Sequence, residues 1–290
     1  MVFILNDLEI TLSEEQTENT PEVLDNTSSN QETKTKEKPK AWTKEWFLYE
    51  TWSWIYIFFI VFGFRSTFID HYHIPSGSLL PTNAIGDSIV VNKMSYGFKV
   101  PFSEFFGTYS DWLGLDKRWE PIYFGEQEVP ERGDIIVFEF PRDKSILFVK
   151  RTIGIPGDVI EIFDNDLYIN GKKIEREVVK DDAKYRELYD PKPGFDPEQM
   201  VFYRQKIGDK EFITGQDSRK KADPPQKYIV PEGHVFVLGD NRDFSADSRY
   251  WGTVPLELVR GKAFFVWMSL VYPWSQEPFH FRPSRIGTRI

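Results

Sequence analysis

The sequence has 290 residues, of which 36 are Lys or Arg and 45 are Asp or Glu, so its formal net charge at pH 7 is -9. Hydrophobic residues make up 40% and aromatic residues 16% of the chain, which excludes a fully disordered protein, and the length allows one large domain or two smaller ones. The absence of cysteine excludes disulfides and Cys-ligated metal sites, and the acidic balance excludes a basic nucleic-acid-binding protein, which would need clustered cations.

The first 45 residues form an acidic segment that is followed by a lysine-rich one. Residues 1–33 contain eight acidic residues and no Lys or Arg, so the rest of the chain is almost neutral. Residues 13–45 contain few large apolar side chains and cannot bury enough surface to offset the entropy of ordering. We therefore predict a disordered tail over residues 1–45.

Residues 46–68 are predicted to form a membrane anchor. The 19 residues from Trp46 to Phe64 carry Glu50 as their only charge, and as a helix they would extend roughly 28 Å, about the thickness of the hydrocarbon core. Lysines 34, 36, 38, 40 and 44 precede this segment and favour a cytoplasmic N-terminus, with the rest of the chain on the other side. The alternative is a buried core helix, although the segment lacks the polar face that such helices usually have.

The remainder, residues 69–290, has the pattern of an antiparallel, mostly β domain. Short runs of β-branched and apolar residues alternate with Gly, Pro, Asn and Asp, and we predict strands over residues 88–92, 134–140, 145–153, 159–163 and 233–239. Residues 103–128 and 172–228 are polar, and we interpret them as irregular insertions. Residues 263–272 are apolar and are predicted to be core, with lipid contact as the alternative.

Two segments contain candidate catalytic side chains. Ser76 and Ser78 lie between two prolines, so the backbone is stiff and presents a hydroxyl at a fixed angle, although Pro and Ser also occur in ordinary loops. Lys150 lies within a predicted strand, where a lysine usually faces solvent. If Lys150 is buried instead, the pKa of its amine falls toward neutrality and the amine becomes a usable general base.

A third segment, residues 239–252, is a polar loop after a predicted strand. Its Ser, Asp and Arg side chains suggest a hydrogen-bonded network, with Asp247 and Arg249 as a candidate pair. A metal site is less favoured here, because no His or Cys accompanies the carboxylates. A Ser-His-Asp triad would need a Gly-x-Ser-x-Gly elbow, which is absent, and Ser78 is not followed by a lysine three residues later.

Taken together, the segments resemble the type I signal peptidases, or leader peptidases, of bacteria. The resemblance runs from the predicted anchor to the C-terminus and is carried by IPSGSLLPT (74–82), GDSIVVNK (86–93), RGDIIVFEFP (132–141), FVKRTIGIPGD (148–158) and LGDNRDFSADSRYWG (238–252). It implies a mostly β catalytic domain of antiparallel sheets, with an inserted second β-rich subdomain at about residues 164–230, behind one transmembrane helix. It also implies a serine endopeptidase that cleaves signal peptides from exported preproteins.

The resemblance assigns roles to individual residues. Ser78 corresponds to the nucleophile, Lys150 to its general base, and Ser76 with the Ser78 N–H to the oxyanion hole. The residues that support the Ser-Lys dyad are Ser245, which would bond the Lys150 amine, and Asp240, Asp247, Arg249 and Arg151. Shallow pockets for small substrate side chains would be lined by Ile74, Pro75 and Val149.

The same resemblance places the chain as a single-pass protein of the bacterial inner (cytoplasmic) membrane, with an extracytoplasmic or periplasmic catalytic domain. The expected partners are signal peptides and the lipid bilayer, with no nucleic acid, cofactor or metal, and we expect a monomer. Leu79, where a Met is common, and Phe244, where a polar residue is common, depart from the family pattern. Two alternatives remain: a dedicated peptidase of the same fold, such as a pilus-subunit processor or a relative of self-cleaving repressors, and a non-enzymatic membrane-tethered scaffold.

Overall fold

The computed structural model describes residue 38 and residues 40–103, 122–188, 190–272 and 279–290. The predicted tail over residues 1–45 lies almost entirely outside the described residues, as does most of the predicted insertion at residues 103–128. The chain divides into a unit that ends at Thr51 and a unit that begins at Trp52.

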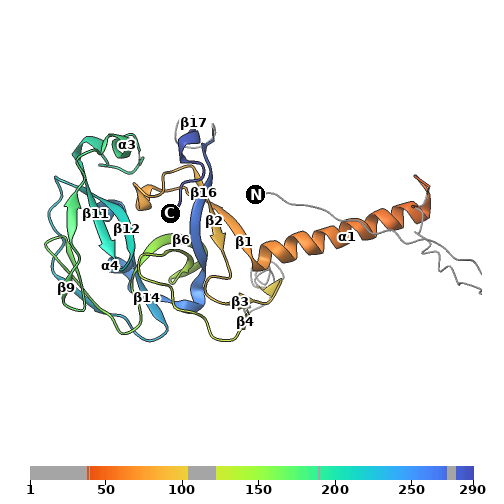
Figure 1. Ribbon diagram of the computed structural model, residues 1–290, viewed down its shortest axis with the longest axis horizontal. Coiled ribbons are helices and arrows are strands. Elements are labelled where there is room, and N and C mark those ends of the chain that lie inside the picture. Colours follow the sequence, from red (N-terminus) through yellow and green to blue (C-terminus); the bar gives the residue numbers. More distant parts are fainter. Residues whose placement is uncertain (1–37, 39, 104–121, 189, 273–278) are drawn as a thin grey trace, which may run out of the picture. The chain divides into compact units, whose positions relative to one another are not determined.

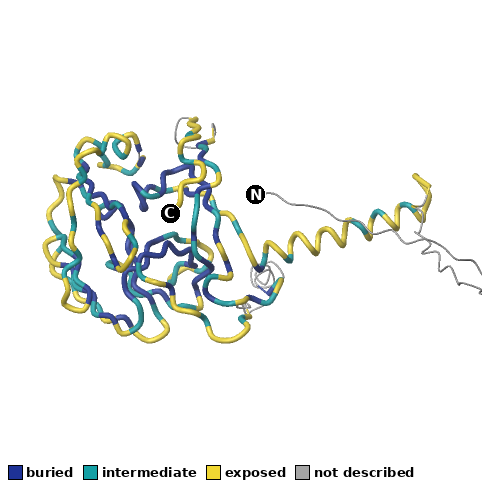
Figure 2. Tube along the Cα trace, viewed as in Figure 1, coloured by how far each residue is buried: buried dark blue, intermediate teal, exposed yellow. Residues whose placement is uncertain are grey.

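The apolar segment forms one long helix, α1, over Lys44–Thr67. Thr43 precedes it, and the Thr43 hydroxyl accepts a hydrogen bond from the Trp46 N–H at 3.2 Å, which caps the first turn. Of the described residues, α1 is the one helix long and apolar enough to cross a membrane, and none of its apolar window is buried (Figures 1 and 2). The interpretation as a buried core helix is therefore wrong for the described part of the chain, which leaves the apolar window of the helix unburied.

The body after α1 is built on one large antiparallel sheet, as the sequence predicts (Figure 1). Its strands follow the order β1-β2-β16-β5-β6-β14-β15, and β17 pairs with β16. The bounds are β1 Ile69–His73, β2 Asp87–Asn92, β5 Ile135–Phe140, β6 Asp143–Gly154, β14 His234–Leu238, β15 Val254–Pro255, β16 Val259–Val271 and β17 His280–Phe281.

The large sheet is covered on both faces at its centre. On β5, Ile135 and Val137 pack into one hydrophobic cluster, while Ile136 and Phe138 pack into another. Alternate residues of a strand point to opposite faces, so a strand with two covered faces needs the continuous apolar run that the sequence shows here. The prediction of core for residues 263–272 holds in part, because Ala263 and Val266 are buried whereas Trp267 is 41% exposed.

Between β6 and β14 the chain leaves the large sheet and builds two smaller ones. One has the order β13-β7-β8-β9 and the other β10-β11-β12. Their bounds are β7 Val159–Phe163, β8 Asp166–Ile169, β9 Lys172–Lys173, β10 Arg176–Val178, β11 Met200–Ile207, β12 Lys210–Asp217 and β13 Gln226–Ile229. A separate pair joins β3 Phe98–Lys99 to β4 Tyr123–Phe124.

The prediction that residues 172–228 are irregular is wrong. The strands β11 and β12 form a hairpin of eight paired positions within this range. Met200, Phe202 and Ile207 of β11 are buried, whereas Arg204 and Lys206 are exposed. Such half-covered strands carry many polar residues, and this composition hid them in the sequence.

Short helices connect the strands and carry several of the loops discussed below. Their bounds are η1 Gly77–Leu79, α3 Ala183–Arg186, η2 Pro197–Gln199, η3 Arg242–Phe244, α4 Ser248–Trp251, η4 Leu256–Leu258 and η5 Pro283–Arg285.

Candidate active site

Ser78 lies in η1, a 3-10 helix of one turn between β1 and β2. Asn241 holds this turn from the loop after β14: its side-chain amide donates to the Gly77 carbonyl at 3.0 Å, and its backbone N–H donates to the Ser78 carbonyl at 3.2 Å. A Cβ at position 77 would overlap the Asp190 carboxylate, so only glycine fits there. The hydroxyl of Ser78 is thus presented by a backbone that is fixed from two sides.

Lys150 lies on β6 and is 4% exposed. Its amine donates hydrogen bonds to the Ser78 hydroxyl at 2.6 Å and to the Val149 carbonyl at 3.1 Å. The pKa of Lys150 is lowered from 10.5 to about 8, mainly by burial and in part by Lys192, while Asp247 and Asp240 act in the opposite direction. At neutral pH about one tenth of such an amine is uncharged and free to accept a proton.

Arg151, the residue after Lys150 on β6, joins three segments around the site. Arg151 forms a bidentate ion pair with Asp240, at 2.8 and 2.7 Å, and both side chains are buried. Arg151 also donates to the Gly133 carbonyl at 2.7 Å, and the Thr82 hydroxyl donates to Asp240 at 2.5 Å. These bonds tie the loop after Ser78 to β6 and to the loop after β14.

Asp247 and Arg249 form a second buried pair, at 2.9 and 3.0 Å. Asp247 also accepts a hydrogen bond from the Gly239 N–H at 3.0 Å, and Arg249 reaches Asp223 at 3.2 Å. The pair fixes the path of the loop that contains Ser245 and Asn241. Sequence reasoning did not identify Asn241, although it lies in the polar loop already singled out.

Ser245 does not make the bond that the resemblance implies. Its side chain is 5% exposed, and its hydroxyl has no hydrogen-bond partner. The expected bond to Lys150 is missing because the amine is directed to Ser78 and to the Val149 carbonyl, while the Ser245 hydroxyl packs against Gly239.

A cavity of about 480 Å³ opens onto Ser78 and Lys150. Ser76, Ile74, Pro75 and Val149 line it. The remaining described lining residues are mainly apolar: Leu79, Val137, Ile146, Leu147, Phe148, Ala246, Tyr72 and His73, together with Lys192. Lys192 comes from the inserted part of the chain and was not identified from the sequence.

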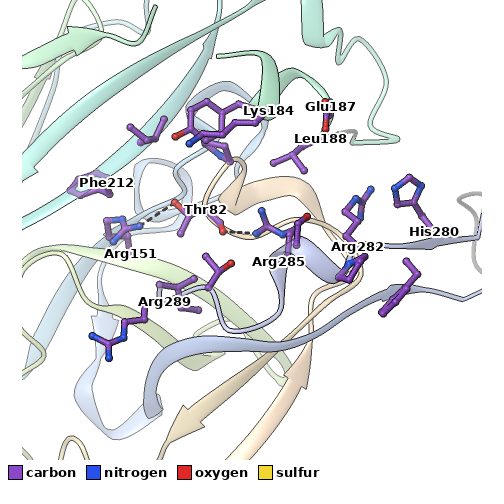
Figure 3. A pocket seen from close by; sticks show the side chains of 18 of the residues that line it. Thr82, Arg151, Lys184, Glu187, Leu188, Phe212, His280, Arg282, Arg285 and Arg289 are labelled. Atoms are coloured by element: carbon purple, nitrogen blue, oxygen red, sulfur yellow. Dashed lines mark hydrogen bonds between the residues drawn. The ribbon is translucent and has the colours of Figure 1, made fainter. Parts of the chain in front are cut away.

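A larger cavity, of about 990 Å³, lies elsewhere and does not include Ser78 or Lys150 (Figure 3). Two of its arginines already have buried carboxylate partners, Arg151 with Asp240 and Arg285 with Asp87 at 2.6 Å. Among the residues that the structure describes, no three His, Asp or Glu side chains gather as a metal ion would require.

The arrangement around Ser78 can perform acyl transfer without a histidine. A serine hydroxyl in contact with a lysine whose pKa is near 8 can lose its proton to that amine as it attacks a carbonyl. These are the parts of a serine hydrolase site.

A family model and two relatives agree with this class. The family described as signal peptidase, peptidase S26, matches residues 44–268. A signal peptidase I of Pseudomonas fluorescens is 36% identical over 248 residues, covering 80% of this chain and 75% of the relative, and one of Pseudomonas aeruginosa is 35% identical with the same coverage. A crystal structure of a signal peptidase I from Enterococcus faecalis V583 is 32% identical and covers 46% of this chain and 95% of its own, with a TM-score of 0.27.

The chain therefore belongs to the signal peptidase family, peptidase S26, and is a serine endopeptidase.

Proposed function

We propose that this protein is a membrane-anchored endopeptidase that removes N-terminal signal peptides from exported preproteins, with Ser78 as nucleophile and Lys150 as general base. The observation that carries the proposal is the 2.6 Å hydrogen bond between the buried Lys150 amine and the Ser78 hydroxyl. The relatives named signal peptidase I support the substrate class.

The reaction follows from the positions of these groups. Neutral Lys150 accepts the proton of Ser78 as the serine oxygen attacks the scissile carbonyl, and the resulting ammonium then gives that proton to the departing amine. The acyl-enzyme is cleared by a water molecule that Lys150 deprotonates in turn. In the proposed reaction Ser76, which lines the cavity, and the Ser78 N–H stabilise the oxyanion, and loss of one such donor typically costs about 2.7–4 kcal/mol.

The remaining residues position this pair. The Arg151–Asp240 and Asp247–Arg249 pairs hold the segments around Ser78 and Lys150, and Ser245 packs beside them. Ile74, Pro75 and Val149 line the cavity, and by the family resemblance they would contact small substrate side chains at the -1 and -3 positions.

The proposed organisation is a cytoplasmic tail over residues 1–45, an anchor over 46–68 and a catalytic domain over 69–290. The lysines before α1 favour a cytoplasmic N-terminus in the bacterial inner membrane, with the catalytic domain outside the cytoplasm. The connection between the anchor and the catalytic domain is short, since α1 ends at Thr67 and β1 begins at Ile69. This supports a catalytic domain that starts directly after the anchor.

The test is cleavage of a preprotein panel by the purified full chain in detergent, with the new N-terminus sequenced. Ser78→Ala and Lys150→Ala are expected to abolish cleavage, whereas Lys172→Ala, at an exposed position of β9, should cleave normally. Activity retained by either of the first two variants would exclude the dyad. Cleavage of a single dedicated substrate, with the general preproteins intact, would instead indicate a specialised peptidase.

A further inference from the structure

Lys192 is a charged side chain in the wall of the Ser78 cavity that no step of the proposed reaction uses. Lys150 and Lys192 are the two Lys or Arg residues among the described residues that line this cavity, and no Asp or Glu is among them. When Lys150 is neutral and able to act as a base, Lys192 supplies the cavity's remaining full charge.

The backbone fixes Lys192 in place. It lies between Pro191 and Pro193, and Gly194 follows with a φ of +85°. The Phe195 N–H donates to the Lys192 carbonyl at 3.1 Å, so residues 192–195 form a tight turn with Pro and Gly at the two central positions, as a type II turn requires. The turn is anchored because Phe195 packs edge-on against Phe244, with ring centroids 5.2 Å apart.

The amine of Lys192 is also held at its far end. It donates to the Phe244 carbonyl, in the loop that carries Ser245. Its closest carboxylate oxygen, from Asp190, is 3.9 Å away and does not form a hydrogen bond with it. Asp190 is 1% exposed, burial raises its pKa while Lys192 lowers it, and its other carboxylate oxygen accepts a hydrogen bond from the Lys192 backbone N–H at 3.2 Å. Asp190 therefore lies at ion-pair distance from the Lys192 ammonium without a direct hydrogen bond to it.

We propose that Lys192 is a specificity-determining residue of the peptidase, whose ammonium favours acidic and disfavours basic substrate side chains next to the scissile bond. The inference rests on the proposed function, because it concerns peptides bound at Ser78. The Lys192 side chain is 38% exposed, and it remains accessible to a substrate. One unit charge near such a partly buried ammonium should change kcat/KM on the order of ten-fold.

The same charge acts on Lys150. The charged groups that influence the Lys150 amine are Asp247 and Asp240, on the loop after β14, and Lys192, from the insertion. Removing the Lys192 charge should therefore raise the pKa of Lys150 toward the ordinary value for lysine. The pH at which kcat/KM is half-maximal should rise with it.

The experiment uses the purified full chain in detergent and a series of peptides with small residues at -1 and -3. The peptides differ only in carrying Glu, Gln or Lys at one position, which is the second residue before the cut or one of the three residues after it. The parent protein should prefer Glu over Lys at one or more positions, and the preference should shrink as salt is added. Lys192→Met should remove the preference and raise the half-maximal pH, and Lys192→Arg should keep both.

Lys220→Met is the matched control. Lys220 also comes from the insertion and donates to a carbonyl of the same loop, that of Asp243 at 2.7 Å, but it is not among the residues that line the cavity. It should keep both the charge preference and the half-maximal pH.

The outcomes separate the two proposals. If the parent cleaves none of the peptides and no preprotein, the proposed function fails. If the parent cleaves the peptides without a charge preference, or with a preference that does not change with salt, the assignment of Lys192 is overturned. It is also overturned if Lys192→Met keeps the charge preference of the parent. The salt dependence is measured on the parent alone, so the inference stays testable even if Lys192→Met does not fold.

Discussion

Replacing Lys150 with methionine should alter stability in opposite directions at neutral and at alkaline pH. Methionine has about the length of lysine without the charge, so Lys150→Met keeps much of the packing while removing a buried ammonium. The variant should be inactive at every pH, because no base remains to accept the proton of Ser78.

The magnitude follows from the pKa. Lowering the pKa of Lys150 from 10.5 to about 8 means that the folded state holds the ammonium at a cost of about 3 kcal/mol below pH 8. Between these two values the unfolded chain binds more protons than the folded one, so the stability of the parent rises with pH in that window. By pH 10 roughly 2 kcal/mol of the cost has gone.

The substitution also removes the two hydrogen bonds of the amine, to Ser78 and to the Val149 carbonyl, each worth about 1 kcal/mol. At pH 7 the variant should therefore be more stable than the parent by about 1 kcal/mol. At pH 10 it should be less stable by a similar amount, and the two should cross near pH 9.

The assay is denaturant unfolding of the full chain in detergent at pH 7, 8, 9 and 10, with Lys172→Met as a control for the substitution itself. The quantity compared is the difference between the free energies of unfolding of variant and parent. A difference that stays constant from pH 7 to pH 10 would refute the reasoning, since it would mean that Lys150 is not desolvated in the folded protein.

Three further results are expected. The kcat/KM of the parent should rise with pH to a plateau and be half-maximal near pH 8, as measured on a peptide substrate, and a profile centred below pH 6 would contradict a lysine base. Gly239→Ala would overlap both the Ser245 hydroxyl and the Ser78 carbonyl, so it should lower kcat by about 100-fold, and a normal kcat would show that the Ser78 turn tolerates movement. Asp247→Asn leaves the Arg249 guanidinium buried without its main partner and should cost about 3 kcal/mol in denaturant unfolding. As a control, Glu161→Gln removes one partner of the surface pair with Lys227 and should cost under about 1 kcal/mol of stability. Equal losses of stability in Asp247→Asn and Glu161→Gln would argue against a structural role for the buried Asp247–Arg249 pair.

Runs of apolar and β-branched residues predicted β2, β5, β6 and β14 of the large sheet, because burial on both faces leaves a continuous apolar run such as the one on β5. The strands β1, β15, β16 and β17 of the same sheet were not predicted. The same signal failed for β11 and β12, whose exposed charged side chains gave the segment a polar composition. Polar composition alone therefore did not distinguish a loop from a strand with one solvent-facing side.

The proposed catalytic pair, Ser78 and Lys150, was assigned from the resemblance, since nothing local in the sequence connects two residues 72 positions apart. The Asp247–Arg249 pairing could be suggested from the sequence, because these residues are two positions apart in a polar loop. The orientation of the Ser245 hydroxyl could not be predicted, because it depends on how the amine of Lys150 divides its bonds between Ser78 and Val149. Lys192 was missed because its position at the cavity depends on the fold of an insertion, although the Pro-Lys-Pro-Gly turn was a local signal.

The register of the hairpin between β5 and β6 decides which side chain of β6 reaches Ser78. In the paired register Lys150 lies opposite Ile136 and Arg151 opposite Ile135, so the amine reaches Ser78 while the guanidinium reaches Asp240. Because side chains alternate between faces, a slip of one residue that brought Arg151 into the place of Lys150 would put a guanidinium, which does not lose its proton, beside the serine. A slip in the other direction would put the apolar Val149 there. An insertion or deletion that changed this register would therefore separate Ser78 from its lysine partner.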